Sequence, residues 1–197
     1  MAHLCTTKTT HTPVKRITTL LALLCATLTL WGQEPVGAVG ADVKSGVVAD
    51  EYALVGVGDN VPSFEVPMTD GRTISTSDLR GKVVLITLWA SWCPSCRKEF
   101  AAIAKGALGS LLAEEGFVWL PIAREENLAT VKGWLAKKGY DVVSGYDTDR
   151  AIYGLFATQE IPRNIVVDAD GTITHHESGY SRKGFSQLVA EIEQMLH

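Results

Sequence analysis

Residues 82–100 have the sequence KVVLITLWASWCPSCRKEF. Residues 82–89 form a nearly continuous run of β-branched and apolar side chains, which is typical of a strand buried on both faces of a parallel sheet. Two cysteines follow, Cys93 and Cys96, and apolar residues recur at helical spacing from Pro94 to about residue 115. The stretch therefore predicts a buried strand that leads through a Cys-x-x-Cys motif directly into a helix.

The position of Cys93 suits it to act as a nucleophile. We expect Cys93 at the helix start, where unpaired backbone N–H groups and the positive end of the helix dipole favour a thiolate and lower the thiol pKa. Pro94 suits the first helical turn because its missing N–H is no loss there. Cys96 lies one turn further along, where its sulfur can reach that of Cys93. The pair can therefore reduce a substrate disulfide while forming the Cys93–Cys96 disulfide, or run the same steps in reverse.

Other roles for this cysteine pair fit the sequence less well. Cysteines three positions apart close too short a loop to stabilise the fold much. A zinc site usually needs four ligands, of which a lone Cys-x-x-Cys supplies two. A c-type haem needs histidine directly after the second cysteine, where this chain has Arg97. We therefore expect a redox-active pair, with no metal and no cofactor.

The N-terminus carries the pattern of an export signal. The first 33 residues contain basic but no acidic side chains, and an apolar run occupies 17–31. That run is shorter than the ~20 residues that span a bilayer comfortably, so a signal peptide at 1–33 is predicted, with a retained membrane anchor as the alternative. Residues 34–55 are rich in Gly, Ala and Val and predict a linker, followed by one domain at 56–197. We expect a periplasmic or other extracytoplasmic location.

The charge of the chain limits the partners it can bind. The chain has 18 basic and 22 acidic residues and no basic stripe, so no nucleic-acid partner is expected, and we expect a monomer.

Two Asp-Gly pairs, at 70–71 and 170–171, predict hairpins. Pro121 cannot donate to a strand ladder, so its strand is expected at an edge or a bulge. Strands are expected at 64–67, 73–75, 117–123, 164–168 and 172–176, and helices at 125–138, 149–156 and 184–196. The order predicts an α/β fold with a mixed central sheet, helices on both faces and an N-terminal β-hairpin.

Over residues 56–197 the chain resembles the thioredoxin superfamily, and most closely its exported TlpA-like branch. The likeness is carried by the Gly-Asp-x-x-Pro-x-Phe pattern at 58–64 and by the segments 81–85, 88–100 and 161–171. The resemblance implies a thioredoxin fold and thiol–disulfide exchange with client proteins, mainly as a reductant, for example one that keeps apocytochrome thiols reduced. It also implies a membrane thiol protein as the electron donor.

The resemblance implies roles for residues around the cysteines. Pro162 is expected to be a cis-proline beside them, with Ile161 presenting its backbone to the substrate, although an ordinary trans proline fits the sequence alone equally well. Trp92 and Pro94 are expected on the substrate-facing surface. Glu99 is expected near the cysteines, where it would tune their pKa values or deprotonate Cys96; the alternative is a solvated helix acid.

The chain also departs from its relatives at two places near this site. Thr87 stands where cytoplasmic thioredoxins have a buried acid, six residues before the first cysteine. Arg163 follows the predicted cis-proline where many relatives have threonine. The first departure removes any proton-handling role from position 87, and the second is expected to alter substrate docking.

Two other functions fit the sequence less well than thiol–disulfide exchange. A peroxiredoxin-type peroxidase needs Pro and Thr or Ser ahead of its cysteine, where this chain has Ile86 and Ala90. A copper- or haem-binding module needs a further soft or imidazole ligand, and no histidine stands near the motif. Thiol–disulfide exchange is therefore the preferred interpretation.

Overall fold

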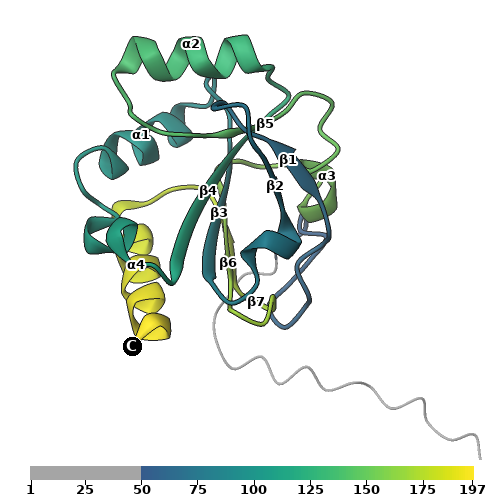
Figure 1. The fold of residues 1–197 in the computed structure, drawn as a ribbon, viewed down its shortest axis with the longest axis vertical. Coiled ribbons are helices and arrows are strands. Elements are labelled where there is room, and N and C mark those ends of the chain that lie inside the picture. The colour runs from purple at the N-terminus through teal and green to yellow at the C-terminus, as the bar shows by residue number, and fades with distance from the viewer. Residues whose placement is uncertain (1–49) are drawn as a thin grey trace, which may run out of the picture. The chain divides into compact units, whose positions relative to one another are not determined.

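The apolar run at 82–89 forms β3 (Val83–Trp89), the central strand of the sheet in the computed structural model (Figure 1). All seven residues of β3 are buried. Val84, Ile86 and Leu88 pack into one apolar cluster, whereas Val83 and Leu85 pack into another, as expected for side chains that alternate across a strand. The prediction of a strand buried on both faces is therefore confirmed.

The structure describes residues 50–197; the predicted leader at 1–33, most of the predicted linker at 34–55, and Cys5 and Cys25 lie outside the described residues. The sheet has the strand order β5-β4-β3-β6-β7. β3 pairs in parallel with β4 (Phe117–Arg124) and antiparallel with β6 (Arg163–Val167). The outer strands are β5 (Gly145–Asp147) and β7 (Ile173–Ser178), and a separate hairpin joins β1 (Glu65–Pro67) to β2 (Thr73–Ser75). The mixed sheet and both predicted hairpins are confirmed.

Helices cover both faces of this sheet (Figure 1). On one face, α1 (Pro94–Ile103) and α4 (Arg182–Leu196) pack with Val83 and Leu85. On the other face, β1 and α3 (Tyr153–Phe156) pack with the even-numbered residues of β3. α2 (Leu128–Lys138) contributes Val131 and Leu135 to a third cluster around Trp89. Two short 3-10 helices, Thr76–Leu79 and Gly109–Ala113, lie in connections.

The ends of the helices differ from the sequence-based expectation. The helix predicted to reach about residue 115 ends at Ile103, because the chain adopts a left-handed backbone at Gly106 (φ 91°) and resumes as a 3-10 helix. α2 begins at Leu128 rather than near 125, because the Asn127 side chain accepts a hydrogen bond from the Thr130 amide (3.0 Å) and caps it there. Local capping therefore shortens elements that apolar spacing alone predicts as longer.

Pro121 lies within an internal strand, which corrects the expectation of an edge position. β4 pairs with β3 from Phe117 to Ala123, and Pro121 is opposite Thr87. β5 pairs only with the end of β4, from Ile122 to Arg124. The proline is tolerated because β4 has a single neighbouring strand at that position.

The described residues begin with a segment that packs onto the domain. Leu54 N donates to Phe156 O (2.8 Å), and Thr158 N donates to Tyr52 O (2.8 Å), so residues 50–55, assigned to the linker from sequence, are hydrogen-bonded to the fold. Ala53 and Ala157 form an antiparallel bridge between the same two segments. Between residues 50 and 197, no helix has both the length and the apolarity needed to cross a bilayer.

Candidate active site

The two cysteines lie where β3 leads into α1, as predicted. Cys93 is the N-cap of α1, and its Sγ accepts a hydrogen bond from the Cys96 amide (3.2 Å). Pro94 occupies the first turn. Cys93 and Cys96 form a disulfide with their Cα atoms 5.3 Å apart, and the exposed fractions are 4% for Cys93 and 0% for Cys96. Only the first cysteine is therefore within reach of a client.

A helix N-cap is a favourable place for a sulfur anion. The amide that bonds to the Cys93 sulfur points from the first turn of α1, and the helix dipole adds positive potential at the same end. Both effects favour a thiolate over a thiol at this position once the disulfide is reduced.

The residues expected to bind substrate differ in their contact with Cys93 and in their exposure. The Ile161–Pro162 peptide bond is cis, as the resemblance implies. The Ile161 carbonyl oxygen lies 3.6 Å from Cys93 Sγ, and the next residue, Pro162, is buried. Trp92 has 56% of its surface exposed, and Pro94 is also exposed. The structure thus brings the Ile161 carbonyl, which precedes the cis bond to Pro162, to the sulfur, and Trp92 and Pro94 are exposed at the surface.

Glu99 is fully buried, so it is not the solvated helix acid of the alternative interpretation. Its Oε1 accepts a hydrogen bond from Asn164 Nδ2 (2.7 Å), while Oε2 has no partner among the described residues. Burial raises the pKa of Glu99 to about 8, and the bond from Asn164 offsets part of that rise. Glu99 follows Cys96 by three residues, on the same side of α1.

A buried polar chain leads to Glu99, and sequence reasoning missed most of it. Trp119 Nε1 donates to Thr87 Oγ1 (3.0 Å), Thr87 donates to Asn164 Oδ1 (3.0 Å), and Asn164 donates to Glu99. Thr87 and Asn164 are both fully buried. Thr87 is the one polar residue of β3, and Asn164 directly precedes the apolar run 165–167 of β6, so a polar residue at a buried strand position is the local signal that could have marked them.

Glu126 supports the loop that precedes Cys93. Its Oε2 accepts a hydrogen bond from the Ser91 amide (2.9 Å), and its Oε1 accepts one from the Ser91 hydroxyl. The sequence places Glu126 in the first turn of the predicted helix 125–138, but the side chain is 6% exposed and faces the active-site loop instead. Glu126 therefore holds the segment from which Trp92 and Cys93 project.

His175 and His176 are neighbours in β7 and are further candidate metal ligands. His175 lies beside Glu177 and Glu191, whereas His176 contacts Val55 and Arg163, so the two neighbouring rings have different partners. Within residues 50–197, no group of three or more His, Cys, Asp or Glu side chains is placed to hold an ion.

The strand, the Cys-x-x-Cys helix start and the adjacent cis-proline on a mixed sheet define a thioredoxin-fold protein. Residues 56–196 match the Redoxin family model, so the chain belongs to the Redoxin family, on the TlpA-like side of the thioredoxin superfamily. It is a thioredoxin-like thiol–disulfide oxidoreductase.

Relatives agree with this class. The chain is 27% identical over 147 residues to the thiol-disulfide oxidoreductase ResA of Bacillus anthracis, covering 75% of this chain and 83% of the relative. It is 29% identical over 145 residues to the thiol:disulfide interchange protein DsbE of Pseudomonas aeruginosa, covering 71% and 77%. A solution structure from Bacteroides thetaiotaomicron, assigned as a protein disulfide isomerase, superimposes with a TM-score of 0.70 at 33% identity, covering 74% of this chain and 92% of that one.

Proposed function

We propose that this chain reduces disulfide bonds of client proteins outside the cytoplasm, using Cys93 as the attacking and Cys96 as the resolving cysteine. The observation that carries the proposal is the position of Cys93 at the N-cap of α1, bonded to a buried Cys96 and 3.6 Å from the Ile161 carbonyl. This arrangement gives one accessible sulfur with a stabilised anion and one protected sulfur that cannot meet a client first.

The reaction begins from the reduced pair. The Cys93 thiolate attacks one sulfur of the client disulfide, the client S–S bond breaks, and the released client thiolate takes a proton from solvent. Cys96 then gives its proton to a base and attacks Cys93 Sγ, which breaks the mixed disulfide and releases the second client thiolate. The proton that Cys96 gave up ends on this second client thiolate. The client gains two electrons and two protons, and this chain is left as the Cys93–Cys96 disulfide seen in the structure.

Glu99 is proposed to take the proton from Cys96 in the second step. Its unpartnered Oε2 is available to hold a proton, and burial raises its pKa to about 8, close to the ordinary value of about 8.5 for a cysteine thiol. A carboxylate with an ordinary pKa would be a much weaker base for a thiol. Glu99 lies three residues beyond Cys96 on α1, so the base would be one helical turn from the resolving cysteine.

The direction and the location rest on the resemblance and on the N-terminal pattern. The TlpA-like likeness favours a reductant that receives electrons from a membrane thiol protein, with apocytochrome thiols as one client class. The predicted leader at 1–33, cleaved as a signal peptide or retained as an anchor, would place the domain on the extracytoplasmic side of the membrane.

The equilibrium of Cys93–Cys96 with glutathione tests the direction. We expect a reduction potential below about −200 mV, in the range of reducing thioredoxin-like proteins; a value near about −120 mV, that of a strong oxidant, would contradict a reducing role. The Cys96→Ser variant should trap clients as mixed disulfides on Cys93. Trapped clients with Cys-x-x-Cys-His motifs would support a role in cytochrome maturation, and a set without them would argue against it.

A further inference from the structure

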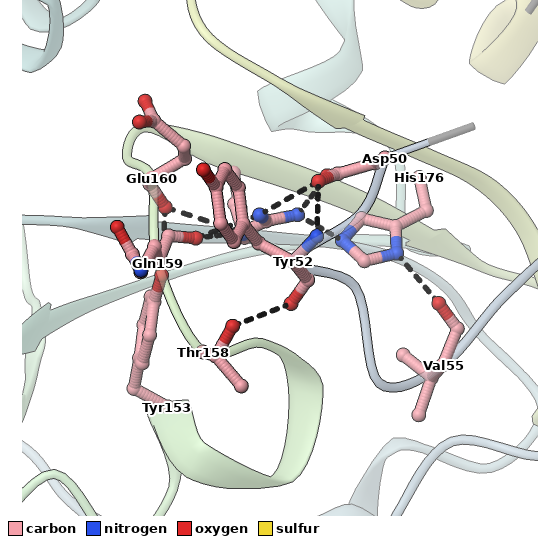
Figure 2. Close-up of polar contacts among 9 residues, drawn as sticks. Asp50, Tyr52, Val55, Tyr153, Thr158, Gln159, Glu160 and His176 are labelled. Carbon is pink, nitrogen blue, oxygen red and sulfur yellow. Dashed lines mark hydrogen bonds and ion pairs between the residues drawn. The ribbon is translucent and has the colours of Figure 1, made fainter. Parts of the chain in front are cut away.

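Arg163 directly follows Pro162, and its side chain is fully buried. Its guanidinium donates to the backbone carbonyls of Gln159 (Nη2, 2.7 Å) and Glu160 (Nε, 3.1 Å). It also donates to both carboxylate oxygens of Asp50, with 3.2 Å between Nη2 and Oδ1, and to His176 Nε2 (3.2 Å). Figure 2 shows these contacts, with Gln159 and Glu160 on one side of the cluster and Asp50 and His176 on the other.

The two carbonyls belong to the loop that presents Ile161 to Cys93. Glu160, just before Ile161, has a left-handed backbone (φ 71°), which a residue with a side chain adopts only when its surroundings hold it there. The Glu160 carbonyl is held from two sides, by Arg163 and by the Tyr153 hydroxyl (2.8 Å). The conformation of the loop therefore depends on the guanidinium next to it.

The guanidinium in turn depends on residues 50–55. Asp50 is the anion that faces it, and Asp50 is fixed by the Tyr52 amide, which donates to its Oδ1 (3.1 Å). Val55 O accepts from His176 Nδ1 (3.0 Å), which leaves His176 Nε2 as the acceptor for Arg163. Asp50 and Arg163 lie 113 residues apart in the sequence, so their ion pair links the first described residues to the active-site loop.

Only arginine fits this set of acceptors. Its planar fork offers five N–H donors, whereas lysine has three donors on one atom and threonine has one. A buried guanidinium without its anion would be left uncompensated, so the arrangement is complete only when Asp50 is in place.

We propose that Arg163 and Asp50 are positioning residues, which hold the 159–162 loop so that the Ile161 backbone can dock the main chain of a protein client beside Cys93. The inference rests on the proposed function, because it assumes that clients react at Cys93. A small disulfide needs only the sulfur, whereas a peptide client also needs the loop. The pair should therefore affect recognition of peptide disulfides more than the intrinsic reactivity of the thiolate.

The test compares two probes on the reduced full chain: oxidised glutathione and a disulfide-bonded peptide of about ten residues. Asp50→Asn removes the anion but keeps the size of the side chain. Arg163→Lys keeps the charge but removes the planar guanidinium and its set of N–H donors. Because a displacement of about 1 Å can cost ~100-fold in rate, we expect kcat/KM for the peptide to fall about tenfold or more, mainly through KM. The rate with oxidised glutathione should stay within about threefold of the wild type.

Asp70→Asn is the matched control, because Asp70 forms an exposed ion pair with Arg72 in the β1–β2 turn and should change neither rate. If Arg163→Lys does not fold, Asp50→Asn carries the test, since 22% of the Asp50 side chain is exposed. Equal losses with both probes, or a lower Tm with an unchanged KM for the peptide, would overturn the inference. A wild-type chain that reacts with neither probe would instead refute the proposed function.

Discussion

At the scale of single residues, the site depends on what burial does to one carboxyl group. Glu99 is enclosed at the side of α1 and receives one hydrogen bond, from Asn164. Desolvation destabilises its ionised form, and the single donated bond only partly compensates. At neutral pH such a carboxyl is mostly protonated, and its ionised fraction is a stronger base than an ordinary carboxylate, so it can take a proton from a thiol.

The pH dependence of stability tests this directly. The folded pKa of Glu99 is about 8, against an ordinary value of 4.5, so above pH 4.5 the unfolded chain ionises while the folded chain does not. The stability present below pH 4.5 is therefore lost progressively as the pH rises through about 8, at about 1.4 kcal/mol per pH unit. In urea unfolding of the oxidised proteins, Glu99→Gln should match the wild type at pH 4 and exceed it by a few kcal/mol at pH 8. A difference that does not change with pH would contradict the assigned pKa.

Asn164 should set the pKa of Glu99. Asn164→Ala removes the bond that favours the carboxylate and leaves the Thr87 hydroxyl without its acceptor, so we expect the pKa of Glu99 to rise further and the unfolding free energy to fall by about 1–3 kcal/mol. The carboxyl carbon of Glu99, followed by NMR as the pH is changed, measures the pKa. Asn127→Ala, which removes the cap of α2, is the control: it should cost stability without moving that pKa.

At the scale of elements, the strand–loop–helix unit was predicted well because its signals are local. The apolar run of β3, the Cys-x-x-Cys spacing and Pro94 all lie within 19 residues of sequence. Helix ends were predicted less well, since Gly106 and Asn127 act through backbone conformation and capping, which apolar periodicity does not report. The edge position predicted from Pro121 was wrong for a related reason: an internal strand tolerates proline where the neighbouring strand is too short to reach it, and β5 begins only opposite Ile122.

The loop between β3 and α1 should be sensitive to Glu126. Glu126→Ala leaves the Ser91 amide without an acceptor, and we expect a loss of about 1–3 kcal/mol in unfolding free energy. Glu125→Ala is the matched control: Glu125 pairs with Arg124 at an exposed position, so the change should be under about 1 kcal/mol. Chemical denaturation of both variants provides the comparison, and equal losses would show that Glu126 does not support the loop.

At the scale of the whole molecule, the contacts that complete the site join distant parts of the chain. Glu99 and Asn164 are 65 residues apart, Thr87 and Asn164 are 77 apart, and Arg163 and Asp50 are 113 apart. No local pattern could have paired them, and the cis bond at Pro162 and the burial of Glu99 were expected only through the resemblance to a family. The fold and the cysteine pair were therefore predictable, whereas the polar support of the site was not.

The reactivity of Cys93 in the reduced protein tests the central claim most directly. Alkylation by iodoacetamide, followed by mass spectrometry across pH, measures which cysteine reacts and with what thiol pKa. The account predicts that Cys93 reacts first, with a pKa clearly below the ordinary value of about 8.5, and that Cys96 is protected. Reaction of Cys93 with an unshifted pKa, or prior reaction of Cys96, would contradict it.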